Sequence, residues 1–551
     1  MCTHLIVDDN NKQNYVDPLV KDCKGRTYFH SACLKGYRSI AIWMIDNAQS
    51  FIHLSTQDHD GRTVFHDVCY HGDTYIVGKI LDNAHNLKGN LNVKDRSNGW
   101  TGFQIACHMN HINIVKMIIE KVEDIKIDLR SRDKLGMNAF HLSCYHGQTL
   151  VVEELIKSLK FNLAKTNSLG RTVFHDVCGN GHVDIFNMLI EKAKELKLDP
   201  TAKDNQGRTA FQDACKHGCT TIVKRMIDNA ESLNFDVSST DNIGRSALHD
   251  ACHEGHEEII DNIMDNADLF KIDLSVTDNS GRTAFHYAVC NHLTSNLEKM
   301  LDKAETHNLD VNLKDDKGRT AIYDVCFHGL TIIFEKMIEK VGRLNIDLTM
   351  KDDDGKTVFH EACQRGCTNI VEKMLEEAEI HKLDFNPKDD KGRTAIHDVC
   401  FHGHTNIFEK IIEKAGRLRI DLTIKDNDGK TPFQEACQLG HTSIVEKMID
   451  NAESLNIDVS SRDKYGNTAF HDACFKGYTK IVTKILDNAE RLKIDLTIEN
   501  NTGRTAFHAA YFNGHTSIVE KIIETAKRLN LDLDLQTSVA PYYIHKYQIS
   551  K

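Results

Sequence analysis

One phrase, Gly-Arg-Thr-Ala-Phe-His with close variants, recurs fourteen times along this chain of 551 residues. From Gly170 onward each copy begins 37 residues after the previous one. Such a period predicts a solenoid, because a unit this short cannot bury its apolar face without a neighbour on each side. A chain devoted to one structural unit leaves little sequence for a catalytic constellation. The opening glycines, taken below as position 0 of each repeat, are Gly25, Gly61, Gly99, Gly136, Gly170, Gly207, Gly244, Gly281, Gly318, Gly355, Gly392, Gly429, Gly466 and Gly503.

The copy at residues 207–243 illustrates the unit. Thr209 precedes a short apolar pattern and predicts a helix N-cap, and Gly218 predicts the end of that helix. A second helix is predicted by the apolar stripe over residues 222–233. Alternation at residues 235–237 favours a short extended segment before the next turn. The predicted fold is therefore an all-α repeat solenoid of about fourteen stacked helix-turn-helix units with short β-hairpin or finger loops.

The run Asp-Asn-Gln-Gly-Arg-Thr-Ala-Phe at 204–211, with Ala214, Gly218 and the Ile-Val pair at 222–223, is similar to an ankyrin repeat. The family pattern is D-x-x-G-x-T-P-L-H-x-A-A-x-x-G-H-x-x-I-V. The resemblance covers residues 22–535, leaving residues 1–21 as an N-terminal extension or degenerate cap and residues 536–551 as a short tail. It implies a protein-binding array whose first helices and finger loops line a concave face.

Three departures from the family pattern stand out. Only Pro432 keeps the proline that opens the first helix, and cysteine replaces the second of the paired alanines in most copies. The unit is also longer than the family's usual repeat by about one helical turn. We therefore expect the second helix to protrude further than usual.

Two stretches break the rhythm. The repeat at 136–170 is shortened, and the repeat that includes 281–300 has Val289 at the cysteine position and His292 where a C-cap glycine is expected. We expect the array to be least stable or most bent there. Drift in a tolerant array and a hinge between sub-solenoids both explain these changes.

The bulk composition excludes several classes of protein. The net charge is −12 with acids and bases interspersed, so no basic stripe predicts nucleic-acid binding. No apolar run is long enough to suggest a membrane span, and the N-terminus lacks a secretory signal pattern. We expect a cytoplasmic protein, with the nucleus as an alternative.

Twelve of the seventeen cysteines share one repeat position. Equivalent residues of stacked helices lie about 8–10 Å apart, whereas the Cα atoms of a disulfide lie within about 7 Å. The cysteines therefore predict a core ladder in a reducing compartment.

Eight repeats combine this cysteine with a histidine three residues earlier, as in His397 and Cys400. Imidazole and thiolate are zinc ligands, and a Cys–His pair also suggests a nucleophile with its base. One pair per repeat neither converges on a metal nor supplies an orienting third group, and the resemblance implies a structural histidine. We predict no catalytic residue, no metal and no cofactor, with a His/Cys metal protein or enzyme as the rival class.

Charged side chains form two further ladders. A base follows most opening glycines, and an acid stands three residues before many of them, as in Arg208 and Asp241. We expect these charges to pair along the fingers.

A third ladder carries an acid at position 6, often followed by an aromatic residue or histidine at positions 9 and 10. An acid in the first turn of a helix complements its dipole, and exposed aromatic residues are favoured binding anchors. We therefore predict a non-catalytic protein-binding scaffold for a protein partner such as a basic peptide or helix, with an adaptor or effector that recruits a target to other machinery as the alternative. The candidate partner-binding residues are Asp67, Tyr70, Asp213, Asp250, Asp324, Phe327, His328, Glu361, Asp398, Phe401, His402, Asp472 and Phe475.

Overall fold

The computed structural model of the chain describes residues 20–47, 52–87, 89–158, 165–230 and 237–531. The chain divides into two compact units, Met1–Ile272 and Asp273–Lys551. Phe235 of the expected extended segment lies outside the described residues, as do residues 1–19 and the whole of the expected tail 536–551.

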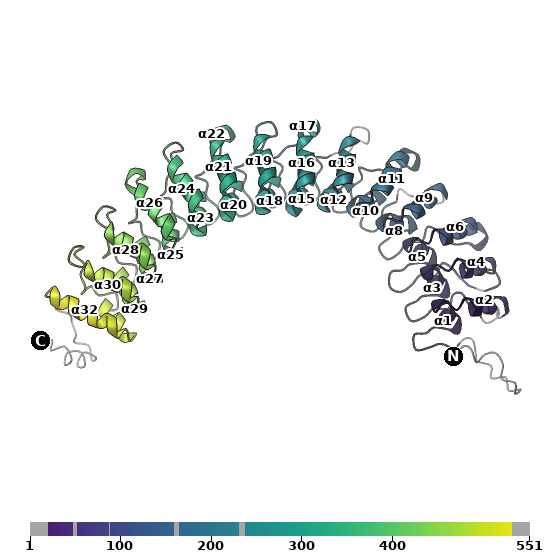
Figure 1. Ribbon diagram of the computed structural model, residues 1–551, viewed down its shortest axis with the longest axis horizontal. Coiled ribbons are helices and arrows are strands. Elements are labelled where there is room, and N and C mark those ends of the chain that lie inside the picture. Colours follow the sequence, from purple (N-terminus) through teal and green to yellow (C-terminus); the bar gives the residue numbers. More distant parts are fainter. Residues whose placement is uncertain (1–19, 48–51, 88, 159–164, 231–236, 532–551) are drawn as a thin grey trace. The chain divides into compact units, whose positions relative to one another are not determined.

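Each unit is a succession of helix pairs, and each pair comes from one repeat of the sequence (Figure 1). In the first unit, the first helices are α1 (Tyr28–Leu34), α3 (Val64–His71), α5 (Gly102–His108), α8 (Ala139–Tyr145), α10 (Val173–Asn180), α12 (Ala210–Lys216) and α15 (Ala247–Glu254). The second helices are α2 (Arg38–Asn47), α4 (Thr74–Asp82), α6 (Ile112–Glu120), α9 (Thr149–Ser158), α11 (Val183–Leu196), α13 (Thr220–Asp228) and α16 (Glu257–Asp265), with the single turns α7 (Val122–Ile125) and α17 (Ala267–Phe270).

The second unit repeats this plan. Its first helices are α18 (Ala284–Cys290), α20 (Ala321–His328), α23 (Val358–Arg365), α25 (Ala395–His402), α27 (Pro432–Leu439), α29 (Ala469–Lys476) and α31 (Ala506–Phe512). The second helices are α19 (Thr294–Asp302), α21 (Thr331–Glu339), α24 (Thr368–Glu377), α26 (Thr405–Leu418), α28 (Thr442–Asp450), α30 (Thr479–Asp487) and α32 (Thr516–Arg528), with the single turn α22 (Val341–Leu344). The predicted all-α repeat solenoid is confirmed.

The predicted start of the first helix is confirmed at α12. Thr209 is the N-cap in extended conformation, and its hydroxyl accepts a hydrogen bond from the Gln212 backbone N–H at 3.3 Å. The helix is short because a left-handed residue follows it at position 11, as at Gly72 (φ 75°). Asn110, in the repeat that opens at Gly99, and His292 take the same left-handed conformation without glycine, so both of these repeats keep the turn.

The second helices bury the predicted stripe; in α13 the buried residues are Ile222, Val223, Met226 and Ile227. The expected protrusion is confirmed only in part, because α11 and α26 run for 14 residues while most second helices stop after nine or ten. Where Asn stands at position 22, as in Asn451, its amide donates to the carbonyl four residues back. That bond competes with the helical pattern, and the helix ends there.

Within each unit, first helices pack on first helices and second helices on second helices along successive repeats (Figure 1). The ladder cysteines are buried in this core, with Cys215 and Cys400 fully covered. All cysteines among the described residues are free. Burial raises the pKa of the Cys215 thiol well above its ordinary value, so the ladder is made of unreactive thiols.

Within the described part of the chain, the finger loops contain isolated antiparallel bridges, such as the one between Lys203 and Thr209, and no extended β-strand. Side chains tie successive fingers together instead. Lys351 Nζ donates to the Lys388 carbonyl at 2.7 Å, and Lys388 Nζ donates to the Lys425 carbonyl at 2.9 Å. These bonds fix the register between neighbouring repeats.

Candidate functional site

The ladder histidines join one repeat to the next. In α10, the Thr172 backbone N–H donates to His175 Nδ1 at 3.1 Å, and His175 Nε2 lies 2.9 Å from the Arg208 carbonyl of the following repeat. Nδ1 therefore accepts while Nε2–H donates, which defines the neutral tautomer. Burial lowers the pKa of His175, in agreement with a neutral ring.

Three repeats place Gln, and one places Tyr323, where the other ten place His. Gln212 Oε1 accepts from the Thr209 N–H at 2.8 Å and its Nε2 donates to the Arg245 carbonyl at 2.7 Å. An amide thus makes the same two bonds as the imidazole. This equivalence indicates a structural role for the His or Gln at position 5. The described residues hold no cluster of three or more His, Cys, Asp or Glu that could bind a metal.

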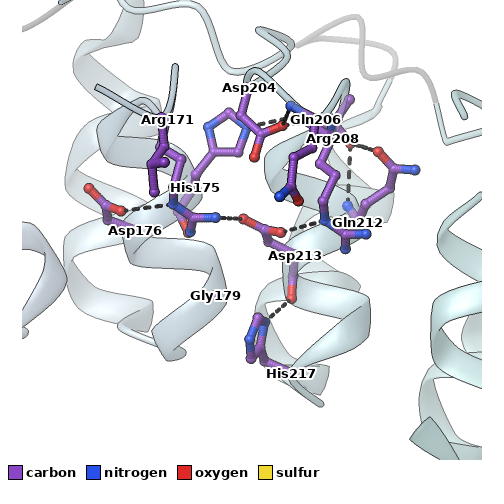
Figure 2. A network of polar contacts seen from close by, with 12 residues as sticks. Arg171, His175, Asp176, Gly179, Asp204, Gln206, Arg208, Gln212, Asp213 and His217 are labelled. Atoms are coloured by element: carbon purple, nitrogen blue, oxygen red, sulfur yellow. Dashed lines mark hydrogen bonds and ion pairs between the residues drawn. The ribbon is translucent and has the colours of Figure 1, made fainter. Parts of the chain in front are cut away.

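The base at position 1 and the acid at position 6 form one network, which sequence reasoning missed. Figure 2 shows Arg171 and Arg208 on either side of Asp213. Arg171 Nη1 lies 2.8 Å and Arg208 Nε 3.1 Å from the Asp213 carboxylate. Arg208 also contacts Asp241 at 3.2 Å and Asp250 at 2.8 Å, so one guanidinium binds three carboxylates from three successive segments.

This network corrects the expectation that the position 6 acids are offered to a partner. The helix packing buries them because position 6 faces the neighbouring first helix. Arginine side chains also form ion pairs with Asp67, Asp176, Asp213, Asp250, Asp324, Glu361 and Asp398. Only Asp472 is partly exposed. The exposed fractions of the others among the candidates are 1% for Asp67, Asp213 and Asp398, 2% for Asp250 and Asp324, and 3% for Glu361.

Burial also changes how these acids titrate. It raises the pKa of Asp67, Asp176 and Asp472 to about 7 and that of Asp324 to about 6. The base of the ladder opposes this shift in Asp67 and Asp176. Part of the ladder is therefore protonated near neutral pH.

Three of the four candidate aromatic residues at position 9 are exposed. Tyr70 is 44% exposed, Phe401 39% and Phe475 54%. Phe327 is half-buried, because the Arg365 guanidinium lies 3.7 Å from its ring centre. At position 10, His402 and His328 each pack edge-on against the preceding phenylalanine, with ring centres 4.9 Å and 5.0 Å apart.

The ladder base lies behind the exposed ring. Arg62 and Arg393 are each 5.1 Å from the ring centres of Tyr70 and Phe401, within reach of a cation–π contact. Each such repeat thus stacks a buried acid, a half-buried base and an exposed ring. We call the surface made by these rings and the finger loops the inner-helix face.

The Asp472 carboxyl offers a test of the acid ladder. Its folded-state pKa of about 7 exceeds the ordinary value of 3.8, so between these values the folded protein keeps a proton that the unfolded chain has lost. Stability falls as pH rises through that window. Asp472→Asn is therefore expected to stabilise the protein at pH 8 by about 1–3 kcal/mol and to change little at pH 4.

Urea unfolding followed by circular dichroism at both pH values measures this effect. Asp315→Asn is the matched variant, because hydrogen bonds from Arg319 and from backbone N–H groups hold the pKa of Asp315 at about 2, so this substitution should destabilise the protein at pH 8. Equal destabilisation by both substitutions would contradict the assignment of Asp472 as an acid whose pKa is raised by burial.

The paired helices, the capped finger turns and the His/Gln bridges define a helical repeat solenoid. A family model described as ankyrin repeats (3 copies) matches overlapping segments that together span residues 65–536. The chain belongs to the ankyrin-repeat family. A search of the curated proteins found no match.

Ankyrin repeats are generally scaffolds for protein–protein interaction, and ankyrin-repeat proteins are typically non-enzymatic. Among the described residues, none of the helices has the length and apolar character needed to cross a membrane.

Proposed function

We propose that this chain is a non-catalytic scaffold that binds a protein partner along the inner-helix face. The observation that carries the proposal is the repeated placement of an exposed aromatic ring at position 9 of a first helix, with the ladder base behind the ring at Tyr70 and Phe401. Tyr70, Phe401 and Phe475 keep 39–54% of their surface in solvent although each stands on a rigid first helix. Large apolar side chains held this way are favoured anchors for a partner.

In the second unit, acids on the finger tips favour a basic segment as the partner. Asp353, Asp354 and Asp390 are exposed. A cavity of about 350 Å³ is lined in part by Asp353, Asp354, Phe327 and Arg365. These exposed carboxylates, and not the buried acids at position 6, supply the charge that a basic peptide or helix would meet.

The same face would serve an adaptor that recruits a target to other machinery. Within the described residues every helix belongs to a repeat, so the structure offers no separate recruiting module. Simple partner binding therefore accounts for the described chain with fewer assumptions.

Affinity purification with the immobilised chain, followed by mass spectrometry, identifies the partner. The variant Phe401→Ala/Phe475→Ala should then weaken binding of that purified partner by about tenfold or more. Ile380→Ala is the matched control, because Ile380 is 71% exposed in the turn after α24 and belongs to no first helix. Equal affinity of the ring variant and the control would contradict the proposal.

A further inference from the structure

The charge ladder is interrupted at α5 and α8. In these two repeats the base is replaced by Trp100 and Met137, and the position 6 acid by Ile105 and Leu142. Leu142 is 2% exposed and Met137 6% exposed. Consecutive apolar replacements at both network positions convert a charged surface into an apolar one.

A groove of about 530 Å³ opens at this interruption. Met137 and Leu142 line it together with Trp100, Leu135 and Leu169. Leu135 is 56% exposed and Leu169 55% exposed, and both stand on neighbouring finger tips. The volume falls in the range of about 300–1,000 Å³ that is typical of ligand pockets.

The aromatic wall of the groove is held in place. Trp100 Nε1 donates to Asp133 Oδ2 at 3.0 Å. The Trp100 ring lies 4.8 Å from the His108 ring, which lies 4.2 Å from the His146 ring. Burial lowers the pKa of both histidines, so these rings are neutral near pH 7. The wall is therefore an ordered, uncharged surface.

The fingers around the groove are basic, although the whole chain carries a net charge of −12. Their exposed bases are Lys94, Arg96, Lys134 and Lys165. Lys94 Nζ donates to the Arg132 carbonyl at 2.5 Å and Lys134 Nζ to the Arg96 carbonyl at 2.6 Å. Because a backbone carbonyl carries no net charge, these hydrogen bonds do not neutralise the positive charges of Lys94 and Lys134.

The acids of these fingers are engaged in the turns. Asp95 is 7% exposed and accepts from the backbone N–H groups of Gly99 and Trp100. Asp133 accepts from the Met137 N–H and from the Trp100 indole. In the third finger Asn167 stands where most repeats have Asp. Residues 94–98, 132–135 and 165–169 together hold five bases and two acids, so these three fingers carry a net positive charge.

We propose that this groove binds a segment of a protein partner in which apolar side chains are flanked by acidic residues. The apolar side chains would pack between Leu135, Leu169 and the Trp100 wall, and the acids would meet the finger-tip bases. This inference rests on the proposed scaffold function. It gives the scaffold a second specificity, for an acidic segment, whereas the finger tips at residues 353–390 favour a basic one.

The test uses the full chain with Trp43→Phe, which leaves Trp100 as its only tryptophan. The probe is a short fluorescein-labelled peptide with a central Leu-Phe pair between runs of Asp and Glu, titrated by anisotropy and by Trp100 emission. We expect saturable binding with a shift in Trp100 emission. Replacing Leu-Phe by Ala-Ala should weaken binding by about tenfold or more, and exchanging the acids for lysines should abolish it.

Two variants locate the site. Leu135→Ala/Leu169→Ala changes exposed residues, so folding should persist while affinity falls about fivefold or more. Met137→Arg/Leu142→Asp rebuilds the pair seen at Arg208 and Asp213, and it should close the groove and abolish binding. Leu150→Ala on α9, at a residue 58% exposed, is the control and should bind as the unchanged chain does.

Binding that survives Met137→Arg/Leu142→Asp, or that fails to distinguish acidic from basic peptides, would overturn this inference. A change of Trp100 emission with protein concentration alone would assign the groove to a second copy of the chain and would also overturn it. Neither result bears on Phe401 and Phe475, so the proposed scaffold function is judged separately by their effect on the purified partner.

Discussion

Arg208→Ala is expected to destabilise the protein by about 3–5 kcal/mol, because it leaves buried carboxylates without their counter-charge. The Arg208 guanidinium binds Asp213, Asp241 and Asp250 and is 6% exposed. Urea unfolding measures the loss, and hydrogen exchange should show faster exchange in α12 and α15 than in distant repeats.

Arg38→Ala provides the control for this prediction. Arg38 lies 3.0 Å from Asp73, but its side chain is 57% exposed. Removing such a surface pair should cost less than about 1 kcal/mol. Similar losses for Arg208→Ala and Arg38→Ala would show that the buried network contributes no more than a surface ion pair.

His397→Ala is expected to cost about 2–4 kcal/mol, since it removes two buried hydrogen bonds and leaves a cavity. His397 Nδ1 accepts from the Thr394 N–H at 3.1 Å and Nε2 lies 3.2 Å from the Lys430 carbonyl. His397→Gln should cost less than about 1 kcal/mol, because Gln434 makes the same bonds in the next repeat.

The pH dependence gives the histidine prediction a second readout. Burial lowers the pKa of His397 from 6.5 to about 4, so between these values the unfolded chain binds a proton that the folded protein excludes. Stability falls as pH drops through this window. Between pH 7 and pH 5, the His397→Gln variant should lose about 2 kcal/mol less stability than the unchanged chain does.

Metal analysis completes this experiment. Stoichiometric zinc in protein purified under reducing conditions, lost on His397→Gln, would contradict the structural role of the ladder histidines. Equal destabilisation by Ala and Gln would contradict the shared hydrogen-bond geometry.

The repeat spacing predicted most of the fold, because N-caps, C-caps and apolar stripes are local signals. Thr209, Gly218 and the stripe of α13 lie where these signals placed them. The lengthened second helix was harder to predict. An Asn at position 22, such as Asn451, ends the helix through a side-chain bond, and a left-handed Lys, Asn or Arg then follows at position 27, as at Asn456.

The candidate site was predicted less completely, because burial depends on what the neighbouring repeat supplies. The acids were identified from their position but their covering bases were not. A signal was present in the sequence. Both repeats with Lys at position 1 have Glu at position 6 and Gln at position 9, as in Lys356, Glu361 and Gln364. In the structure Lys356 Nζ donates to the Gln364 side chain, so these positions change together because they touch.

Two expectations stay predictions. The cytoplasmic location has no structural counterpart. The stretches at 136–170 and 281–300, which we expect to be less stable or more bent, keep the repeat's left-handed turn at Gly147 and His292. Hydrogen exchange of those helices would decide between drift and a hinge.

Hydroxyl-radical footprinting of the complex with the purified partner tests the central claim most directly. The chain carries reactive aromatic residues on both rows of helices with similar exposure: Tyr70, Phe401 and Phe475 on first helices, and Trp43 and Tyr75 at 58% and 53% on second helices. Binding along the inner-helix face should protect residues of the first set and leave Trp43 and Tyr75 unchanged. Protection of Trp43 and Tyr75 with the first set unchanged would contradict it.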